Sequence, residues 1–167
     1  SQDRAQECAG KPGVFSRNLM VDPNDLGAVE QAFEANARFL RPRQGGNWCY
    51  HEIIALPKTV KEKDKGAIEA MLFELAARYV KGRAPRQLVW GQVHWETKHP
   101  HLHLVVSANE VRSPRRVRLA KARFTQIIEE LEVFKCARWP EVLPEKLWQY
   151  RKRYNQHRRS HSEDHLT

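Results

Sequence analysis

Hydrophobic and polar positions follow two different periods along this chain. Apolar residues recur at helical spacing over residues 25–40 and 61–81, which predicts two amphipathic helices. Over residues 87–96 and 101–108 apolar and polar residues alternate, which predicts two strands with one buried face each. Residues 48–56 are rich in β-forming and apolar side chains and stop before a proline, so we expect a central strand there.

The remaining segments complete one α+β arrangement. We expect a third helix to end near Phe134 and a last one over residues 145–159, whereas residues 1–23 predict an extended lead-in without strong structure. This order favours an antiparallel β-sheet covered by helices on one side. We expect one domain over residues 1–140, followed by a basic C-terminal helix and frayed tail over 141–167.

Composition and charge restrict the class of protein and of partner. A chain of 167 residues with 41% hydrophobic and 29% charged residues is typical of a globular domain. It shows no apolar run of roughly 20 residues, no secretory leader, and three widely spread cysteines, so we expect a cytoplasmic protein without a membrane partner. Its formal charge of +9 indicates an anionic partner, most commonly nucleic acid.

Two basic stretches are candidates for contacts with a phosphate backbone. The alternative is that they are ordinary solvated faces. The candidate residues are Arg112, Arg115, Arg116, Arg118, Lys121, Arg151, Lys152 and Arg153.

Four of the eight histidines lie within ten residues of one another, between His94 and His103. His101 and His103 alternate with leucines and should project from one face of a strand. If the preceding strand pairs with it antiparallel through the turn at residues 97–100, His94 joins them. Three neutral imidazoles that leave coordination positions open are typical of a catalytic metal site. The alternative is a group of solvated surface histidines.

Such a site beside a basic surface suggests phosphate chemistry. A divalent ion, Mg²⁺ or Mn²⁺ before Zn²⁺, would polarise a scissile phosphate, and no small-molecule cofactor is expected. Glu96 follows His94 on the same face and could orient an imidazole or accept a proton. It could equally be an exposed carboxylate in a turn.

The segment His94-x-Glu96-x-x-His99-Pro-His101-Leu-His103 with the Val-Val that follows resembles the third motif of conjugative relaxases. These are the HUH-superfamily nucleases of plasmid mobilisation. The strand from Tyr50 to Pro57 and the segment Arg17-Asn18-Leu19 are similar to the plasmid and T-DNA branch of that family, so the resemblance covers roughly residues 15–130.

The resemblance implies a metal-dependent transesterase that nicks single-stranded DNA at a transfer origin and retains the 5′ phosphate on a tyrosine. Accessory mobilisation proteins would be further partners. Carried over by position, His94, His101 and His103 would be the metal ligands. His51 would lie on an adjoining strand with a supporting role, although a histidine satisfied within the core is the alternative.

The nucleophile is where this sequence departs from the family pattern. Relaxases of this branch carry their tyrosine near the N-terminus, but no tyrosine precedes Tyr50 here. Either the chain begins after that motif, or Phe15 stands where a tyrosine once stood, or the nucleophile lies elsewhere. Tyr150 and Tyr154 are four residues apart with cations between them. They resemble the one or two tyrosines that HUH replication initiators and transposases carry on a helix downstream of the histidines. The alternative is that they serve packing.

Two other functions compete with a relaxase. The spacing His99-x-His101-x-His103 also fits histidine-triad nucleotide hydrolases, in which a histidine is the nucleophile, but the +9 charge and the additional His94 argue against them. A domain without a nucleophile would instead bind nucleic acid without cutting it.

Overall fold

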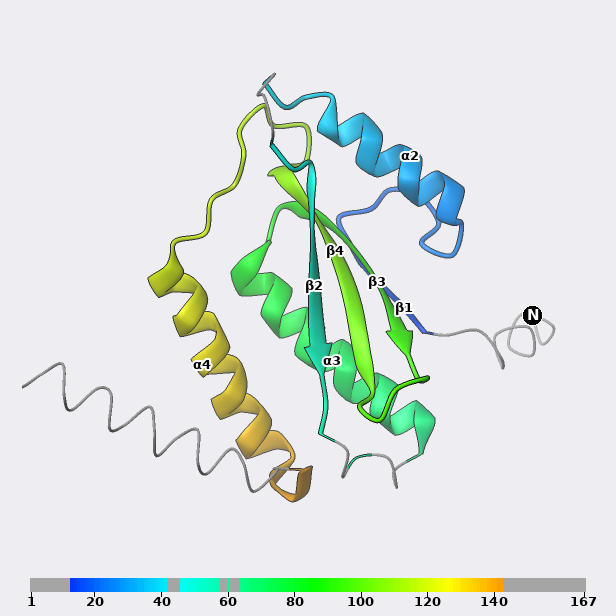
Figure 1. The fold of residues 1–167 in the computed structure, drawn as a ribbon, viewed down its shortest axis with the longest axis vertical. Helices are drawn as coiled ribbons and strands as arrows, with labels where there is room; N and C mark the ends of the chain where they lie inside the picture. Colours follow the sequence, from blue (N-terminus) through cyan, green and yellow to red (C-terminus); the bar gives the residue numbers. More distant parts are fainter. Residues whose placement is uncertain (1–12, 42–45, 58–59, 61–63, 143–167) are drawn as a thin grey trace, which may run out of the picture.

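The computed structural model describes residues 13–41, 46–57, 60 and 64–142 and has the α+β architecture expected from the sequence (Figure 1). An antiparallel four-stranded sheet has the order β1-β3-β4-β2. Its strands are β1 (Val14–Arg17), β2 (Cys49–Ala55), β3 (Gln87–His94) and β4 (His101–Glu110). The helices are α2 (Leu26–Ala37), α3 (Lys65–Arg83), α4 (Lys121–Arg138) and the short 3-10 helix η2 (Pro140–Val142).

Aspartate caps begin the first two helices. The Asp25 carboxylate accepts a hydrogen bond from the Ala28 N–H, and Asp64 accepts one from Ala67. Helix α2 ends at Ala37, three residues earlier than predicted. In α3 every residue of the predicted apolar stripe is buried: Ile68, Met71, Leu72, Leu75 and Tyr79.

The main core lies between α3 and one face of the sheet. Strands β3 and β4 supply buried side chains to it, among them Val93, Leu102 and Leu104. Gly91 lies in the same layer, where an added Cβ would come within 2.6 Å of Leu104 Cδ2 and 2.7 Å of the His103 carbonyl oxygen. Close contact between the two central strands therefore requires glycine at this position.

Strand β2 is an edge strand, so the predicted central position is wrong. Its side chains alternate: Ile54 packs against the core, whereas Ile53 is 54% exposed on the opposite face. The short apolar run looked like a strand buried on both faces, but β2 pairs with β4 alone.

Residues 14–17 form strand β1 although the sequence predicted no strong structure before residue 23. Phe15 lies opposite Gly91 in the β1–β3 register, and its ring packs near that of Phe73 with centroids 6.1 Å apart. Four residues are too few to show the two-residue period of a strand, so the sequence alone could not predict β1. Its extended conformation follows from pairing with β3.

Helices lie on both faces of the sheet, which corrects the expectation of helices on one side. Helix α2 packs Val29 and Phe33 against Leu88, with Trp90 and Val105 beside them, on the face away from α3. These contacts lie in the half of the sheet where β3 begins. No described helix covers the half of that face where β3 ends and β4 begins (Figure 1).

Candidate metal centre

Three histidines converge on the half of the sheet face that no described helix covers. The β3–β4 register pairs His94 with His101 and Gln92 with His103. One ring nitrogen from each of His94, His101 and His103 lies within 4.8 Å of the others. Within the residues that the structure describes, this is the one group of His, Cys, Asp or Glu side chains close enough to share a metal ion.

The turn between β3 and β4 orients His101. Its Nδ1 lies 2.9 Å from the His99 carbonyl oxygen and 3.1 Å from Thr97 Oγ1. The Thr97 hydroxyl itself donates to the same carbonyl at 2.7 Å. Because a carbonyl oxygen can only accept, Nδ1 of His101 carries the proton. Nε2 is then the free nitrogen, and it lies 2.9 Å from Nε2 of His103. The sequence motif gave no sign of this role for Thr97.

The same turn is fixed to the end of β2. The Leu56 N–H donates to the Pro100 carbonyl at 2.9 Å, and His99 Nδ1 donates to the Leu56 carbonyl at 3.3 Å. His99 is therefore held at the turn, outside the three-histidine group. The turn, β2 and β4 together form a rigid support for the imidazoles.

His51 joins the group from β2. Its Nε2 lies 2.6 Å from Nδ1 of His103. The resemblance placed His51 near the site, and the β2–β4 pairing brings it there, on an exposed face rather than in the core.

Burial lowers the pKa of His103 below its ordinary value, and the neighbouring imidazoles of His94, His101 and His51 lower it further when they are charged. A neutral imidazole keeps a lone pair for coordination. This half-buried candidate ligand is therefore held in the form that can bind a metal.

Glu96 does not join the histidines. Strand β3 ends at His94, and Glu96 is exposed in the bend that follows. Within the described ranges no hydrogen bond connects its carboxylate to an imidazole of the cluster. Its role as a proton acceptor or orienting group stays a prediction.

The described tyrosines and Phe15 lie on the side of the sheet away from the histidines. Tyr79 donates its hydroxyl proton to Glu52 Oε2 at 2.6 Å, in the layer between the sheet and α3. Burial raises the pKa of Tyr79 above its ordinary value, and Glu52 raises it further. Tyr50 and Phe15 also belong to the helix-facing side, so a tyrosine at position 15 would point away from the histidines. Tyr150 and Tyr154 lie outside the described residues.

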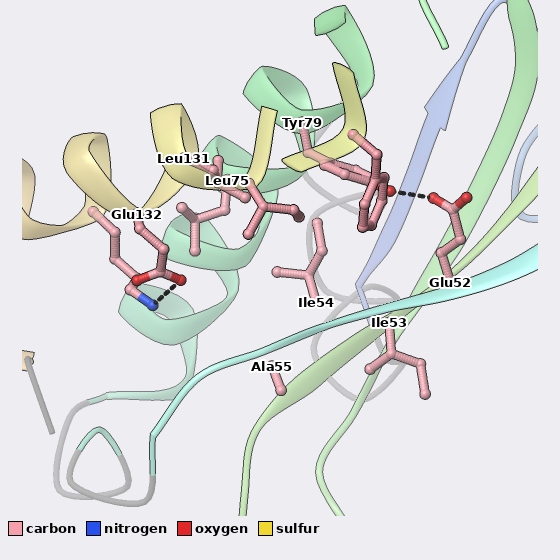
Figure 2. A pocket seen from close by; sticks show the side chains of 11 residues that line it. Glu52, Ile53, Ile54, Ala55, Leu75, Tyr79, Leu131 and Glu132 are labelled. Atoms are coloured by element: carbon pink, nitrogen blue, oxygen red, sulfur yellow. Dashed lines mark hydrogen bonds and ion pairs between the residues drawn. The ribbon is translucent and has the colours of Figure 1, made fainter. Parts of the chain in front are cut away.

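Behind β2 lies an apolar groove of about 380 Å³ that none of the three histidines lines. Figure 2 shows Ile54 of β2 facing Leu75 and Leu131 across it, with the Tyr79–Glu52 hydrogen bond at one end. This groove therefore belongs to the helix side of the sheet, whereas His51 and His94 are exposed on the opposite face.

The first basic stretch forms a loop at the opposite end of β4 from the histidines (Figure 1). Arg112, Arg115 and Arg118 are exposed there, as is Lys121 at the start of α4. Arg116 is half-buried and donates from its guanidinium to the Asn47 carbonyl. The candidates Arg151, Lys152 and Arg153 lie outside the described residues.

Two buried asparagines fix this basic loop. Asn36 Nδ2 donates to Asn109 Oδ1 at 3.1 Å, and Asn109 donates back to the Asn36 carbonyl at 2.9 Å. The Arg112 N–H donates to Asn36 Oδ1 at 2.8 Å, and Arg112 has a φ of 57°. A polar network therefore holds the left-handed backbone that few non-glycine residues adopt.

With this geometry in place, comparison with known families decides the assignment. The family described as "Relaxase: MobA/VirD2-like, nuclease domain" matches residues 8–133, more than half of the chain. The chain belongs to this family. No curated protein and no solved structure matches it.

The relaxase assignment made from the histidine motif is thus confirmed, and the domain is of the nuclease class. The match includes the whole sheet and all four clustered histidines. A histidine-triad hydrolase is not supported, because His99 lies outside the cluster. In the described part of this relaxase domain no helix is long and apolar enough to cross a membrane.

Proposed function

We propose that this relaxase domain nicks single-stranded DNA at a transfer origin by metal-dependent transesterification. The observation that carries the proposal is the convergence of His94, His101 and His103 on the half of the sheet face that no described helix covers. An open surface of this kind can admit a DNA strand, which a closed pocket could not.

The residues present fit a divalent ion. Three imidazoles offer three neutral nitrogens, and the orientation of His101 aims its free Nε2 toward His103. A site with three protein ligands leaves positions for phosphate oxygens, as catalytic sites require. We propose Mg²⁺ or Mn²⁺, with Zn²⁺ as the alternative because imidazole suits it well. When bound, the ion would withdraw charge from the non-bridging oxygens of the scissile phosphate.

The chain's own groups would hold the strand and the reacting atoms. The exposed basic loop at Arg112, Arg115 and Arg118 would contact the phosphate backbone away from the cleavage point. A tyrosine oxygen would form a bond to phosphorus while the bond to the 3′ oxygen breaks. The tyrosine would lose its proton to a base, and the departing 3′ oxygen would take one up.

Tyr150 and Tyr154 are the proposed nucleophiles within this chain. Support for them comes from exclusion: Tyr79 is committed to Glu52, and Tyr50 belongs to the same helix-facing side. The cations between the two proposed nucleophiles in the sequence, Arg151, Lys152 and Arg153, would favour the phenolate.

The experiment that tests this function is denaturing electrophoresis after incubation with labelled single-stranded oligonucleotides and Mn²⁺. We expect a covalent protein–DNA band that disappears with chelator and in His101→Ala. Tyr150→Phe and Tyr154→Phe would identify the nucleophile by loss of the band. Cleavage that persists in chelator would contradict the proposal.

A second candidate is a domain that binds DNA without cutting it. The observation in its favour is that both described tyrosines, Tyr50 and Tyr79, lie away from the histidines. Tight binding of the oligonucleotide with neither a covalent band nor a shortened product would select this candidate.

A further inference from the structure

We propose that His51 is a positioning residue that sets the tautomer and ring orientation of His103. The inference rests on the proposed function, in which His103 is a metal ligand. It assigns a role to a side chain whose place in the sheet is known but whose chemistry is not.

The two rings meet edge to edge. His51 and His103 are parallel to within 7°, and their centroids are 4.8 Å apart. His51 Nε2 and His103 Nδ1 lie 2.6 Å apart, closer than two stacked ring faces can approach, so the nitrogens point at each other along a hydrogen bond. This in-plane contact restricts rotation of the His103 ring about its χ2 torsion.

The proposed coordination then assigns the protonation of both rings. Nε2 of His103 faces the free Nε2 of His101 at 2.9 Å, inside the cluster, and is the nitrogen that can coordinate. A neutral ligand imidazole must carry its proton on the other nitrogen, here Nδ1. That proton can be donated to Nε2 of His51, which must then accept. His51 thus performs for His103 the task that the His99 carbonyl performs for His101.

His51 is not a fourth ligand in this geometry. Its Nε2 meets His103 on the side remote from the cluster, and the three nitrogens within 4.8 Å come from His94, His101 and His103. To share a metal ion with the cluster, His51 would have to lie on the Nε2 side of the His103 ring, not the Nδ1 side.

A largely buried ion pair fixes the strand beneath His51. The next residue, Glu52, points to the opposite face, where Oε1 lies 2.8 Å from Arg83 Nη2 and Oε2 accepts from Tyr79. The Arg83 side chain is 9% exposed. Strand β2 is at the sheet edge, so this anchor replaces the support that a second neighbouring strand would give.

The test compares His51→Leu, which removes the acceptor, with His51→Gln, which can restore it through its amide oxygen. Mn²⁺ affinity is measured by calorimetry, and the Nδ1 proton of His103 by NMR on the Zn²⁺-loaded protein. Ile53→Val is the matched control, because it alters an exposed side chain on the same strand and face. Circular dichroism establishes that each variant is folded.

We expect His51→Leu to weaken Mn²⁺ binding by about 10–100-fold, the usual effect of losing such a partner, and to remove the protected Nδ1 proton signal. His51→Gln should recover most of the affinity, and Ile53→Val should leave it unchanged. Wild-type affinity and an intact Nδ1 signal in His51→Leu would overturn the inference.

Two further outcomes separate this inference from the proposed function. Zn²⁺ X-ray absorption that counts four imidazoles in the wild type and three in His51→Leu would make His51 a ligand and overturn the positioning role alone. Failure of the wild type to bind Mn²⁺ or Zn²⁺, or equal binding by His101→Ala, would overturn the metal site itself, and the role of His51 with it.

Discussion

His94 lies directly opposite His101 in the register of the β3–β4 hairpin, and this pairing defines the candidate metal site. The two imidazoles come from different strands but lie on one face of the sheet, because the side chains of directly paired residues project to the same side. A slip of one residue would turn one strand's side chains to the other face. The turn at Thr97–Pro100, bound to β2 through Leu56, holds the register where it is.

Loss of His101 should abolish metal binding. In His101→Ala the remaining imidazoles come from His94 and His103, and no other described ligand lies within the group. We expect calorimetric titration with Mn²⁺ to show no specific binding, while the folded circular dichroism spectrum is retained. His99→Ala is the control, since it removes a histidine of the same motif but keeps the backbone carbonyl that orients His101. The Leu56–Pro100 backbone hydrogen bond still attaches the turn to β2 in this variant. Equal affinity of wild type and His101→Ala would contradict the site.

Gly91→Ala should weaken both the fold and the site. The new methyl group would meet Leu104 and the His103 carbonyl at 2.6–2.7 Å, so β3 must move away from β4. We expect a loss of about 1–3 kcal/mol in the free energy of unfolding, measured with urea, together with weaker Mn²⁺ binding. In the control Gly27→Ala the added Cβ meets its nearest neighbour at 3.5 Å, and stability should not fall. Unchanged stability of Gly91→Ala would show that the strands can separate without cost.

Removing Glu52 should destabilise the domain strongly. Arg83 is 9% exposed and its Nη1 has no hydrogen-bond partner among the described residues, so Glu52→Leu would leave a buried charge uncompensated. We expect a loss of about 3 kcal/mol in the free energy of unfolding. Glu74→Leu breaks an ion pair with Arg138 whose two side chains are 41% and 55% exposed, and should cost about 1 kcal/mol or less. A similar loss of unfolding free energy in Glu52→Leu and Glu74→Leu would contradict the larger contribution assigned to the Glu52–Arg83 pair.

Acidification should destabilise the chelator-treated domain partly through His103. Its pKa is lowered in the folded state, so the unfolded chain takes up the proton first as pH falls. The contribution is complete above about pH 6.5, the unfolded value, and is lost as pH falls through the folded pKa. We expect urea denaturation to give a smaller free energy of unfolding at pH 5 than at pH 7. The difference should shrink in His103→Gln; an identical difference in that variant would contradict the assignment to His103.

Much of the site could be predicted from the sequence because side chains of a strand alternate strictly between its two faces. Alternation alone predicted that His101 and His103 share one face, and antiparallel pairing with the preceding strand would add His94. The structure shows that pairing, with residues 95–100 connecting the two strands. The groups that orient these rings could not be predicted in the same way. Thr97 acts through a hydroxyl and His99 through a backbone carbonyl, and neither leaves a pattern in the sequence.

The fold was predicted less completely, for reasons visible in β1 and β2. Both are edge strands. Whether a strand lies at the edge of a sheet depends on how many neighbouring strands pair with it, and local composition does not reveal that number. Ile53 looked like a core residue, yet its exposed position follows from the place of β2 beside β4. Helix α2 was found from its spacing, but the spacing does not say which face of a sheet it will cover.

The basic loop should contribute salt-dependent affinity for single-stranded DNA. Arg115 and Arg118 are exposed on a loop that the Asn36–Asn109 pair holds in one conformation. Each phosphate contact to a single strand adds about 0.7 to the slope of log K against log salt, so the double variant Arg115→Ala/Arg118→Ala should lower that slope by about 1.4. Fluorescence anisotropy of an oligonucleotide at several salt concentrations measures it.

The control for this measurement is Arg138→Ala, which removes a cation of α4 that is ion-paired with Glu74. Net charge then falls by one, but no free cation is lost from the loop, so the slope should stay near its wild-type value. If Arg138→Ala lowered the slope by about 0.7, the value of one phosphate contact, total charge rather than the loop would govern binding. A wild-type slope in the loop double variant would place the DNA elsewhere on the relaxase domain.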